Sequence, residues 1–320
     1  MNAARARLAR YAPVLVSAPA LAGAVWWGSR QQVPALPADG VALRLLAAAL
    51  GLYALAMLVR CERWHRLLVL TGVPSARADA YGLVAVGYMA NNTLVARAGD
   101  VLKVVLTAGR TGAGGVRVAG LAVGERGFDA LALAILFVVA GLLSPRLGFT
   151  GSDTVLRGAA IAGVAALALA TAAVLARRTR IALAVRGQLV AAAQSMRPLA
   201  GRGGLQLLGM SLALWLAEAA VYLTVGRAVD VHLDLLACVQ IVTLVNLVGL
   251  IPAAPANLGT FDAAVLFATR RLTSGSALAY VLVLRLVLFV PITLIGLVVL
   301  VTRHGGLGRL RTLRPLSSRA

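Results

Sequence analysis

The sequence predicts an all-α polytopic membrane protein, and three observations carry this prediction. The chain has 320 residues, of which 60% are hydrophobic and only 13% are charged, and its mean hydropathy is +0.89. A globular domain carries about 25% charged residues, so this chain has too few charges to cover a water-exposed surface. Apolar runs of the roughly 20 residues that cross a bilayer recur along the chain. Arginines gather in the short loops between those runs, as they do in the cytoplasmic loops of membrane proteins.

The basic charge of the chain indicates a lipid partner. The 31 lysines and arginines outnumber the 11 acidic residues and give a net charge of +20, with Lys103 as the only lysine. A strongly basic chain can bind nucleic acid, but these cations mostly lie beside apolar runs, where phospholipid headgroups are the nearer anions. The two cysteines and three histidines have no metal-ligand spacing, and no P-loop is present. We therefore expect no nucleic acid, no metal and no cofactor.

Six runs are apolar and long enough to cross a bilayer. They cover residues 11–29, 41–59, 118–142, 155–176, 205–226 and 277–301. Basic residues precede the first run, as in a signal peptide, but Trp26 and Trp27 stand where small residues would permit cleavage. We expect the first run to stay in the protein as an uncleaved anchor.

Two further apolar stretches, residues 80–106 and 235–270, are interrupted near their middle. The first interruption is NNTLVARAGD, residues 91–100, and the second is PAAPANLG, residues 252–259. Proline removes a backbone donor and clashes with the preceding turn. Non-helical backbone inside a membrane is stable only against protein or a water-filled cavity. Both stretches are predicted as broken helical hairpins, and the sequence leaves open whether each re-enters on one side or crosses completely.

Each half of the chain therefore contains two spans, a broken hairpin and a third span. Three crossings per half make the second half, about 151–304, an inverted copy of the first, about 1–150, within a single membrane domain over 1–320. The alternative is that one break is an ordinary short loop. If both hairpins return to the side they enter, most loop arginines fall on the side of the N-terminus. We expect a multi-pass protein of the bacterial inner (cell) membrane with both termini, including a basic tail at 305–320, in the cytoplasm.

Charged side chains in the apolar segments are the candidate site, because an unpaired charge there is costly. A first group comes from the first break and the span that follows it: Asn92, Arg97, Asp100, Lys103, Glu125, Arg126 and Asp129. Glu125 and Asp129 are four residues apart on one helix face, where they repel unless a cation intervenes. Arg97, Lys103 or Arg285 could be that cation. These cations could bind a phosphate; the alternatives are an interfacial loop with self-paired charges and an ion cluster that only fixes packing.

A second group lies around the second break: Pro252, Pro255, Asn257, Gly259, Asp262 and Arg285. A helix is expected to restart after Pro255, with Asn257 as its N-cap, and its unpaired N–H groups would favour an anion. Asp262 falls in the first turns, where a carboxylate is favourable in any case. Arg285 is alone in the last span and needs a carboxylate, for which Glu218 and Asp262 are both available.

The segment RCERWHRLL, residues 60–68, is predicted as a basic helix at the membrane surface. Trp64 would lie at the headgroup level, and Arg63 and Arg66 would face lipid phosphates. Residues 177–202 are predicted as a second amphipathic segment of this kind. For both segments, anchoring to the membrane is favoured over a binding site.

The polar motifs together resemble the lysylphosphatidylglycerol synthase transmembrane family, a flippase-like membrane domain that also occurs without the aminoacyl-transferring domain. The first family motif, approximately N-N-x-x-P-x-R-x-G-E, resembles NNTLVARAGD, with Val95 in place of the proline and Asp100 in place of the glutamate. The second motif, E-R-x-x-D, resembles Glu125, Arg126 and Asp129.

The third family motif, P-x-x-P-G-G-x-G-x-x-E, resembles PAAPANLGTFD. Pro252, Pro255 and Gly259 match, whereas Ala256 and Asn257 replace two glycines and Asp262 replaces the glutamate. The resemblance extends over nearly the whole chain, from RCERWHRLL to the last span.

The resemblance implies translocation of a lipid between the leaflets, often a phospholipid with a modified headgroup. From the intramembrane charges together with this resemblance, we expect the lipid to be an anionic or modified phospholipid or a polyprenyl-phosphate lipid. No aminoacyltransferase domain follows the last span, so we expect no enzyme activity. Besides the lipid, a partner would be a second copy of the chain or a separate lipid-modifying enzyme. Two other classes stay open: a non-transporting lipid-binding or regulatory subunit, and a membrane enzyme acting on a lipid-linked substrate.

Overall fold

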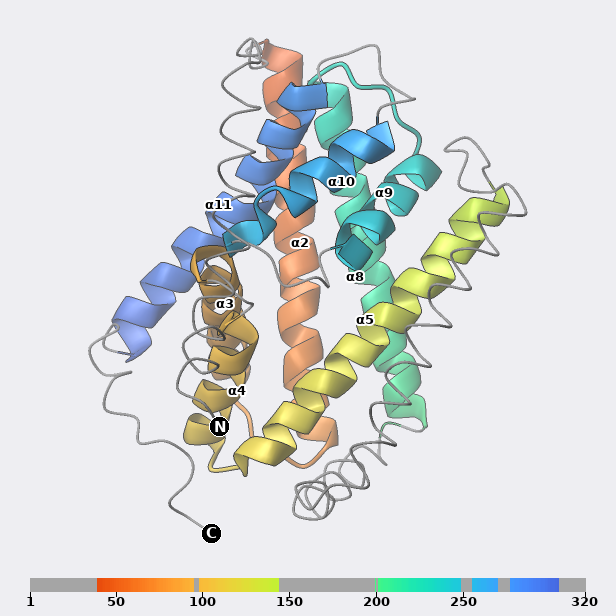
Figure 1. The fold of residues 1–320 in the computed structure, drawn as a ribbon. Helices are drawn as coiled ribbons and strands as arrows, with labels where there is room; N and C mark the ends of the chain where they lie inside the picture. The colour runs from red at the N-terminus through yellow and green to blue at the C-terminus, as the bar shows by residue number, and fades with distance from the viewer. Residues whose placement is uncertain are drawn as a thin grey trace, which may run out of the picture.

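A computed structural model describes residues 39–94, 98–143, 199, 201–248, 255–269 and 277–304 of the protein (Figure 1). All regular structure in this part of the chain is helical. Four of its helices are long and apolar enough to cross a membrane: α2 (Gly40–Leu70), α5 (Gly115–Leu143), α8 (Arg202–Ala228) and α11 (Ala277–His304). They confirm the all-α polytopic class and correspond to four of the predicted spans. The spans predicted at 11–29 and 155–176, and most of the segment 177–202, lie outside the described residues.

The two interrupted stretches are broken helical hairpins. The first consists of α3 (Arg77–Thr93) and α4 (Ala98–Thr111). The second consists of α9 (Leu235–Val248), the short 3-10 helix η3 (Pro255–Asn257) and α10 (Thr260–Thr269). The four α-helices have 17, 14, 14 and 10 residues. At a rise of about 1.5 Å per residue, none of them spans the roughly 30 Å of a bilayer core.

The hairpins enter the helical bundle from opposite ends. In Figure 1, α3 and α4 fill the lower part of the molecule, α9 and α10 fill the upper part, and each pair has its break toward the middle. The two breaks meet there, because α3 contacts η3. Since each pair begins and ends at the same end of the molecule, both are re-entrant hairpins, which the sequence left undecided.

The backbone of the second break differs from the predicted one. Asn257 was predicted as an N-cap, but it lies in a left-handed turn, with φ of 50° there and 53° at Ala256, and α10 begins only at Thr260. Asparagine adopts positive φ more readily than most residues. At the start of α10 the Asp262 carboxylate accepts a hydrogen bond from the N–H of Gly259 (2.9 Å). An acidic side chain thus satisfies a backbone donor that no helical carbonyl can reach.

Small residues let the helices of the first hairpin pack closely. A methyl group on Gly99 of α4 would collide with the carbonyl oxygen of Gly87 on α3. One on Gly296 of α11 would collide with the carbonyl oxygen of Ala85, also on α3. Close approach through small residues is typical of helix packing in membranes. Helix α3 is thereby held between α4 and α11.

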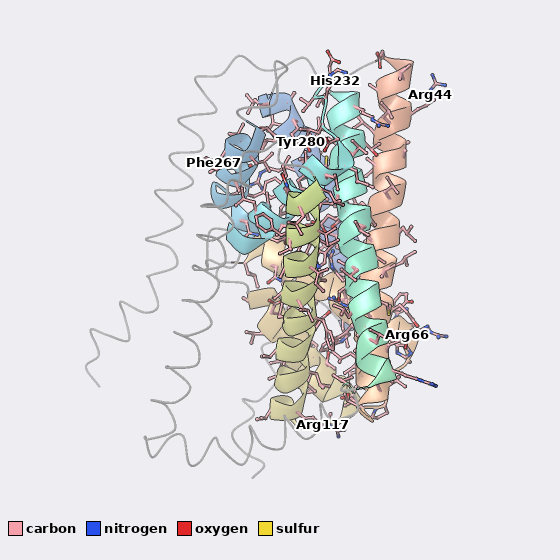
Figure 2. All side chains as sticks on the ribbon, turned by 90° about the vertical axis from the view of Figure 1, so that its right-hand side faces the viewer. Arg44, Arg66, Arg117, His232, Phe267 and Tyr280 are labelled. Carbon is pink, nitrogen blue, oxygen red and sulfur yellow. The ribbon has the colours of Figure 1, made fainter. Side chains whose placement is uncertain are left out.

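Several of the more exposed polar side chains lie toward the two ends of the molecule. Figure 2 shows Arg44 and His232 near one end, and Arg66 and Arg117 near the other. Large apolar side chains are exposed on the long helices, including Leu55, Leu58, Leu131, Val138, Leu216, Leu294 and Val298. An apolar exterior with polar ends is the surface that a lipid environment requires.

Candidate functional site

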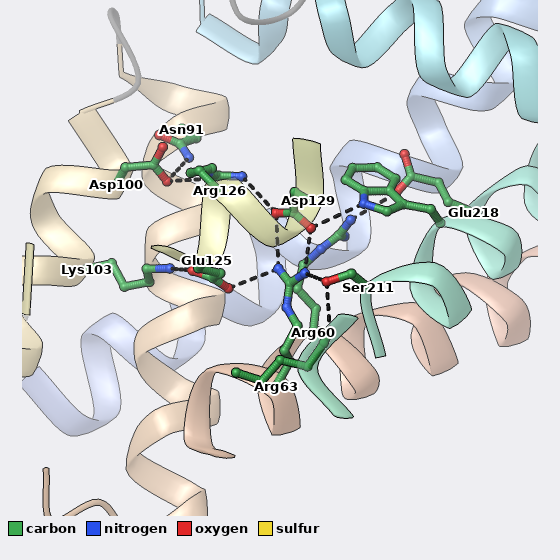
Figure 3. Close-up of polar contacts among 12 residues, drawn as sticks. Arg60, Arg63, Asn91, Asp100, Lys103, Glu125, Arg126, Asp129, Ser211 and Glu218 are labelled. Carbon is green, nitrogen blue, oxygen red and sulfur yellow. Dashed lines mark hydrogen bonds and ion pairs between the residues drawn. The ribbon is translucent and has the colours of Figure 1, made fainter. Parts of the chain in front are cut away.

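Charged side chains from distant parts of the sequence form one cluster between α2, α4, α5 and α8 (Figure 3). Ion pairs join four cations to four carboxylates, so the formal charges of the cluster cancel. Its members are Arg60, Arg63, Asp100, Lys103, Glu125, Arg126, Asp129 and Glu218. Because an unpaired buried charge is costly, each member depends on its partners.

Arg63 is the centre of the cluster. Its Nη1 donates to Asp129 Oδ1 and to Ser211 Oγ, both at 2.5 Å. Its Nη2 donates to Asp129 Oδ2 (3.1 Å) and to Glu125 Oε1 (3.2 Å). The Asp129 contact is bidentate, the arrangement in which arginine binds a carboxylate most strongly. With 2% of its side chain exposed, Arg63 joins α2, α5 and α8 from inside the protein.

Lys103 of α4 is the second cation that pairs with Glu125. Its Nζ donates to Glu125 Oε2 (2.5 Å) and lies 3.9 Å from the ring centroid of Trp64. The ring attracts the ammonium by a cation–π interaction. The repulsion expected between Glu125 and Asp129 is thus relieved by two cations: Lys103, which the sequence suggested, and Arg63, which it did not.

The prediction of a surface helix at residues 60–68 is therefore wrong for Arg63 and Trp64. These residues form the end of α2, and Trp64 and Arg63 are buried rather than facing headgroups and phosphates. Only Arg66 keeps the predicted exposure, and it pairs with Glu62 (2.9 Å). The continued apolar pattern beyond Arg63, at Leu67 and Leu68, was the signal that the helix runs on through the protein interior.

Arg126 and Asp100 join the first break to α5. Arg126 Nη2 donates to Asp100 Oδ1 (2.7 Å), which also accepts from Asn91 Nδ2 (3.2 Å). Asp100 and Lys103 lie three residues apart on α4, as predicted, and pair with Arg126 and Glu125 of α5, whereas Arg97, expected on the same face, lies outside the described residues. The Arg126 side chain is 38% exposed, far more than Arg63. It is the most exposed cation of the cluster.

Arg60 links the cluster to α8. Its Nη2 donates to Glu218 Oε2 (3.1 Å), and its guanidinium lies 5.2 Å from the ring centroid of Tyr88 and 5.1 Å from that of Trp215. Trp215 Nε1 in turn donates to Asp129 Oδ1 (3.2 Å). Glu218, which the sequence offered as a partner for Arg285, thus forms its ion pair with Arg60. Sequence reasoning did not place Arg60, Ser211 or Trp215 in the site.

The second break has its own ion pair, between α10 and α11. Arg285 Nε donates to Asp262 Oδ1 (2.5 Å) and its Nη2 to Oδ2 (2.6 Å). Arg285 also donates to the carbonyl oxygens of Ala256 (3.2 Å) and Asn257 (3.4 Å). Of the two carboxylates considered for Arg285, Asp262 is the partner. The guanidinium therefore holds the left-handed turn against α11, while Pro252 lies outside the described residues.

A cavity of about 140 Å³ lies between the two breaks. The cluster residues Arg60, Arg126 and Glu218 line it. The remaining lining comes from α2, α3, α8, α9, η3, α10 and α11: Tyr53, Tyr88, Asn91, Asn92, Trp215, Tyr222, Val245, Asn246, Ala256, Asn257, Phe261, Leu288 and Phe289. The walls thus combine charged groups, amides and aromatic rings, the lining expected of a ligand site.

Several polar atoms of this lining have no hydrogen-bond partner within the described part of the chain. They are Arg60 Nε, Asn91 Oδ1 and the Tyr222 hydroxyl, and all three are buried. Asn92, by contrast, donates to Thr293 Oγ1 (2.8 Å). Since buried polar groups are normally paired, the three free atoms are available to a ligand or water. Among the described residues, no three His, Cys, Asp or Glu side chains come together in a way that could hold a metal ion.

The fold and the site define a polytopic helical membrane protein with a charged cavity enclosed by two re-entrant hairpins. Residues 11–296 match the model of the lysylphosphatidylglycerol synthase TM region, and the chain belongs to this family. Comparisons with curated proteins and with solved structures found no match. The family membership confirms the resemblance carried by the three motifs and gives the protein a lipid-related role in a membrane.

Proposed function

We propose that the protein moves a lipid, an anionic or modified phospholipid or a polyprenyl-phosphate lipid, between the two leaflets of its membrane. The observation that carries this proposal is the charged cavity between the two breaks, enclosed by helices whose outer surfaces are apolar. A lipid headgroup cannot cross the hydrocarbon core without polar partners, because burying an unpaired charge is costly. The cavity would supply those partners while the acyl chains stay in the bilayer.

The cluster residues have two different tasks in this proposal. The most deeply buried members, Arg63, Glu125, Asp129 and Lys103, hold α2, α4, α5 and α8 together. Arg126 is more exposed, lines the cavity and would contact the headgroup. Lys103 was also predicted to bind phosphate; its ion pair with Glu125 favours the supporting task.

The proposal assigns the chain no catalytic step. The lipid would be made or modified by a separate enzyme, and the protein would act on the finished lipid. It would do so in the bacterial inner membrane, with the termini in the cytoplasm. A purely structural subunit would need neither a half-exposed arginine nor unpaired polar atoms around a cavity, so these features favour transport over the regulatory alternative.

Leaflet exchange in proteoliposomes tests the proposal. Fluorescent lipids labelled on an acyl chain are placed in both leaflets, and a membrane-impermeant quencher reports which molecules reach the outer leaflet. We expect wild type to accelerate exchange at least tenfold over protein-free vesicles, and Arg126→Gln to lose most of this acceleration. Arg110→Gln is the matched control, because Arg110 pairs with Asp79 on the surface, outside the cavity. No acceleration for any lipid class would contradict translocation.

A further inference from the structure

The described charged residues around the cavity balance one another, and this bears on which headgroup fits. The four cations and four carboxylates of the cluster cancel among the described residues, and the neighbouring Arg285 is balanced by Asp262. Among these described residues, no surplus cation is left to compensate a headgroup with a net negative charge inside the membrane. A headgroup with one positive and one negative charge needs no surplus cation.

We propose that the cavity selects a zwitterionic lipid headgroup, with one phosphodiester and one primary ammonium group. This inference rests on the proposed function and, among the lipids named there, favours a modified phospholipid with a net-neutral headgroup over the anionic lipids. The phosphate would lie at the Arg126 end of the cavity and the ammonium at the Glu218 end. Figure 3 shows these two residues on opposite sides of the cluster, with Asp129 and Arg60 between them.

The Arg126 end offers hydrogen-bond donors to a phosphate. Arg126 uses Nη2 for Asp100, whereas its Nη1 is 3.7 Å from Asp129 Oδ2, too long for a hydrogen bond. The Nε of Arg60, which also lines the cavity, is buried without a partner in the described residues. Two guanidinium groups with unused N–H donors match the oxygens of a phosphodiester.

The Glu218 end offers hydrogen-bond acceptors to an ammonium. Glu218 and Tyr222 are four residues apart on α8, so they lie on one face of the helix, and both line the cavity. The Tyr222 hydroxyl is fully buried, and no described residue bonds to it. A primary ammonium has three donors and no acceptor, so it can bind the carboxylate and the hydroxyl together. The rings of Tyr53 and Trp215 in the same lining attract a cation as well.

The size of the cavity suits a compact headgroup. A volume of about 140 Å³ is close to that of the roughly 150 Å³ cavity that accommodates benzene in a protein core. A phosphate with a short amino-alcohol arm is compact enough for such a space.

Equilibrium binding tests the inference without relying on transport. Short-chain phosphatidylethanolamine, phosphatidylcholine and phosphatidylglycerol are titrated into the detergent-solubilised protein, and tryptophan fluorescence reports binding. We expect the ethanolamine lipid to bind about tenfold more tightly than the glycerol lipid, because one additional charge-assisted hydrogen bond changes the affinity by about this factor. The choline lipid should bind more weakly than the ethanolamine lipid, because its quaternary ammonium has no N–H. Equal or tighter binding of the glycerol lipid would overturn the inference.

Two substitutions sharpen this test. Glu218→Gln leaves Arg60 without its carboxylate and the cluster with one surplus positive charge, so the preference should shift about tenfold toward the glycerol lipid. Tyr222→Phe removes one acceptor and should weaken only the ethanolamine lipid, about threefold. Glu62→Gln is the matched control, since Glu62 is a carboxylate of α2 outside the cavity that pairs with Arg66 and Arg77. A ratio of two dissociation constants measured on one sample does not depend on the fraction of folded protein, so poor folding of a variant does not obscure the result.

The headgroup inference and the proposed function fail in different ways. Selective binding of the ethanolamine lipid without leaflet exchange in proteoliposomes would support the headgroup inference and contradict translocation. Exchange that is equally fast for the ethanolamine and glycerol lipids, together with equal binding, would overturn the headgroup inference and leave translocation standing.

Discussion

The two broken hairpins are each joined to the long helix that follows them by an arginine and an aspartate. In the first hairpin Asp100 pairs with Arg126 of α5, and in the second Asp262 pairs with Arg285 of α11. The first pair belongs to a network of eight charges that includes residues of α2 and α8. The second pair is bound instead by backbone groups and the rings of Phe261 and Phe289.

This difference indicates how one architecture can be stabilised in two ways. The first hairpin is held by charges shared among four helices, so its position depends on the whole cluster. The polar contacts between the second hairpin and α11 centre on one arginine, which contacts Asp262, Ala256 and Asn257 together, while apolar residues of α9 and α10 pack in the main core. We therefore expect the second hairpin to loosen on its own and the first to loosen only with the bundle.

The largest effect is expected from removing the centre of the cluster. Arg63→Met leaves Asp129 and Glu125 without their shared cation, and breaking a buried ion pair costs about 3–5 kcal/mol. The melting temperature in detergent should fall strongly and size-exclusion profiles should broaden. Arg66→Met, on the exposed side of the same helix, should leave both unchanged. Equal effects of the two substitutions would contradict a central structural task for Arg63.

The next effect is expected at the second hairpin. Arg285→Met removes the contacts to Asp262, Ala256 and Asn257 and should destabilise this hairpin by about 2 kcal/mol. Hydrogen exchange should rise in α10 and remain unchanged in α3 and α4. Exchange that rises equally in both hairpins would show that they are not independent.

A smaller effect concerns the close packing of the first hairpin. Gly99→Ala places a methyl group against the carbonyl oxygen of Gly87 and should cost about 1–3 kcal/mol of stability. Gly109→Ala is the matched control in the same helix, because no atom lies within 4 Å of its added methyl group. Alanine there should stabilise α4 by up to about 1 kcal/mol, because glycine is the poorer helix former. Thermal unfolding of the two variants should therefore shift in opposite directions.

The smallest effect is expected at the open end of the first hairpin. Asp79 of α3 and Arg110 of α4 form an ion pair (3.0 Å) in which both side chains are substantially exposed. Exposed pairs contribute about 0–1 kcal/mol, so Asp79→Asn should change the melting temperature very little. A large loss of stability would mean that the first hairpin is held at its open end rather than by the cluster at its break.

Local chemistry made the fold largely predictable. The prolines around Pro255 and the polar run after Asn91 marked the two breaks, because neither fits a continuous helix in a membrane. The four described spans followed from apolar length alone. The extent of α2 was missed, because Arg60 and Arg63 look the same in sequence whether they face lipid headgroups or buried acids.

The partners in the site depended on contacts between distant residues. Arg63 meets Asp129 and Ser211 across 66 and 148 positions, and no local pattern encodes these distances. For Arg285 the sequence left two possible partners, Glu218 and Asp262. The packing of α10 on α11 places Asp262 beside Arg285. The sequence therefore identified the segments that carry the charges but not what most of those charges contact.

Blocking the cavity tests the central claim most directly. Asn246 lines the cavity, so Asn246→Cys provides a thiol there, whereas the native Cys61 and Cys238 are buried. Leaflet exchange is measured before and after reaction with a bulky thiol reagent, with identically treated wild type as the control. The account predicts that exchange stops in the labelled variant and continues in wild type. Undiminished exchange with the cavity filled would contradict transport through it.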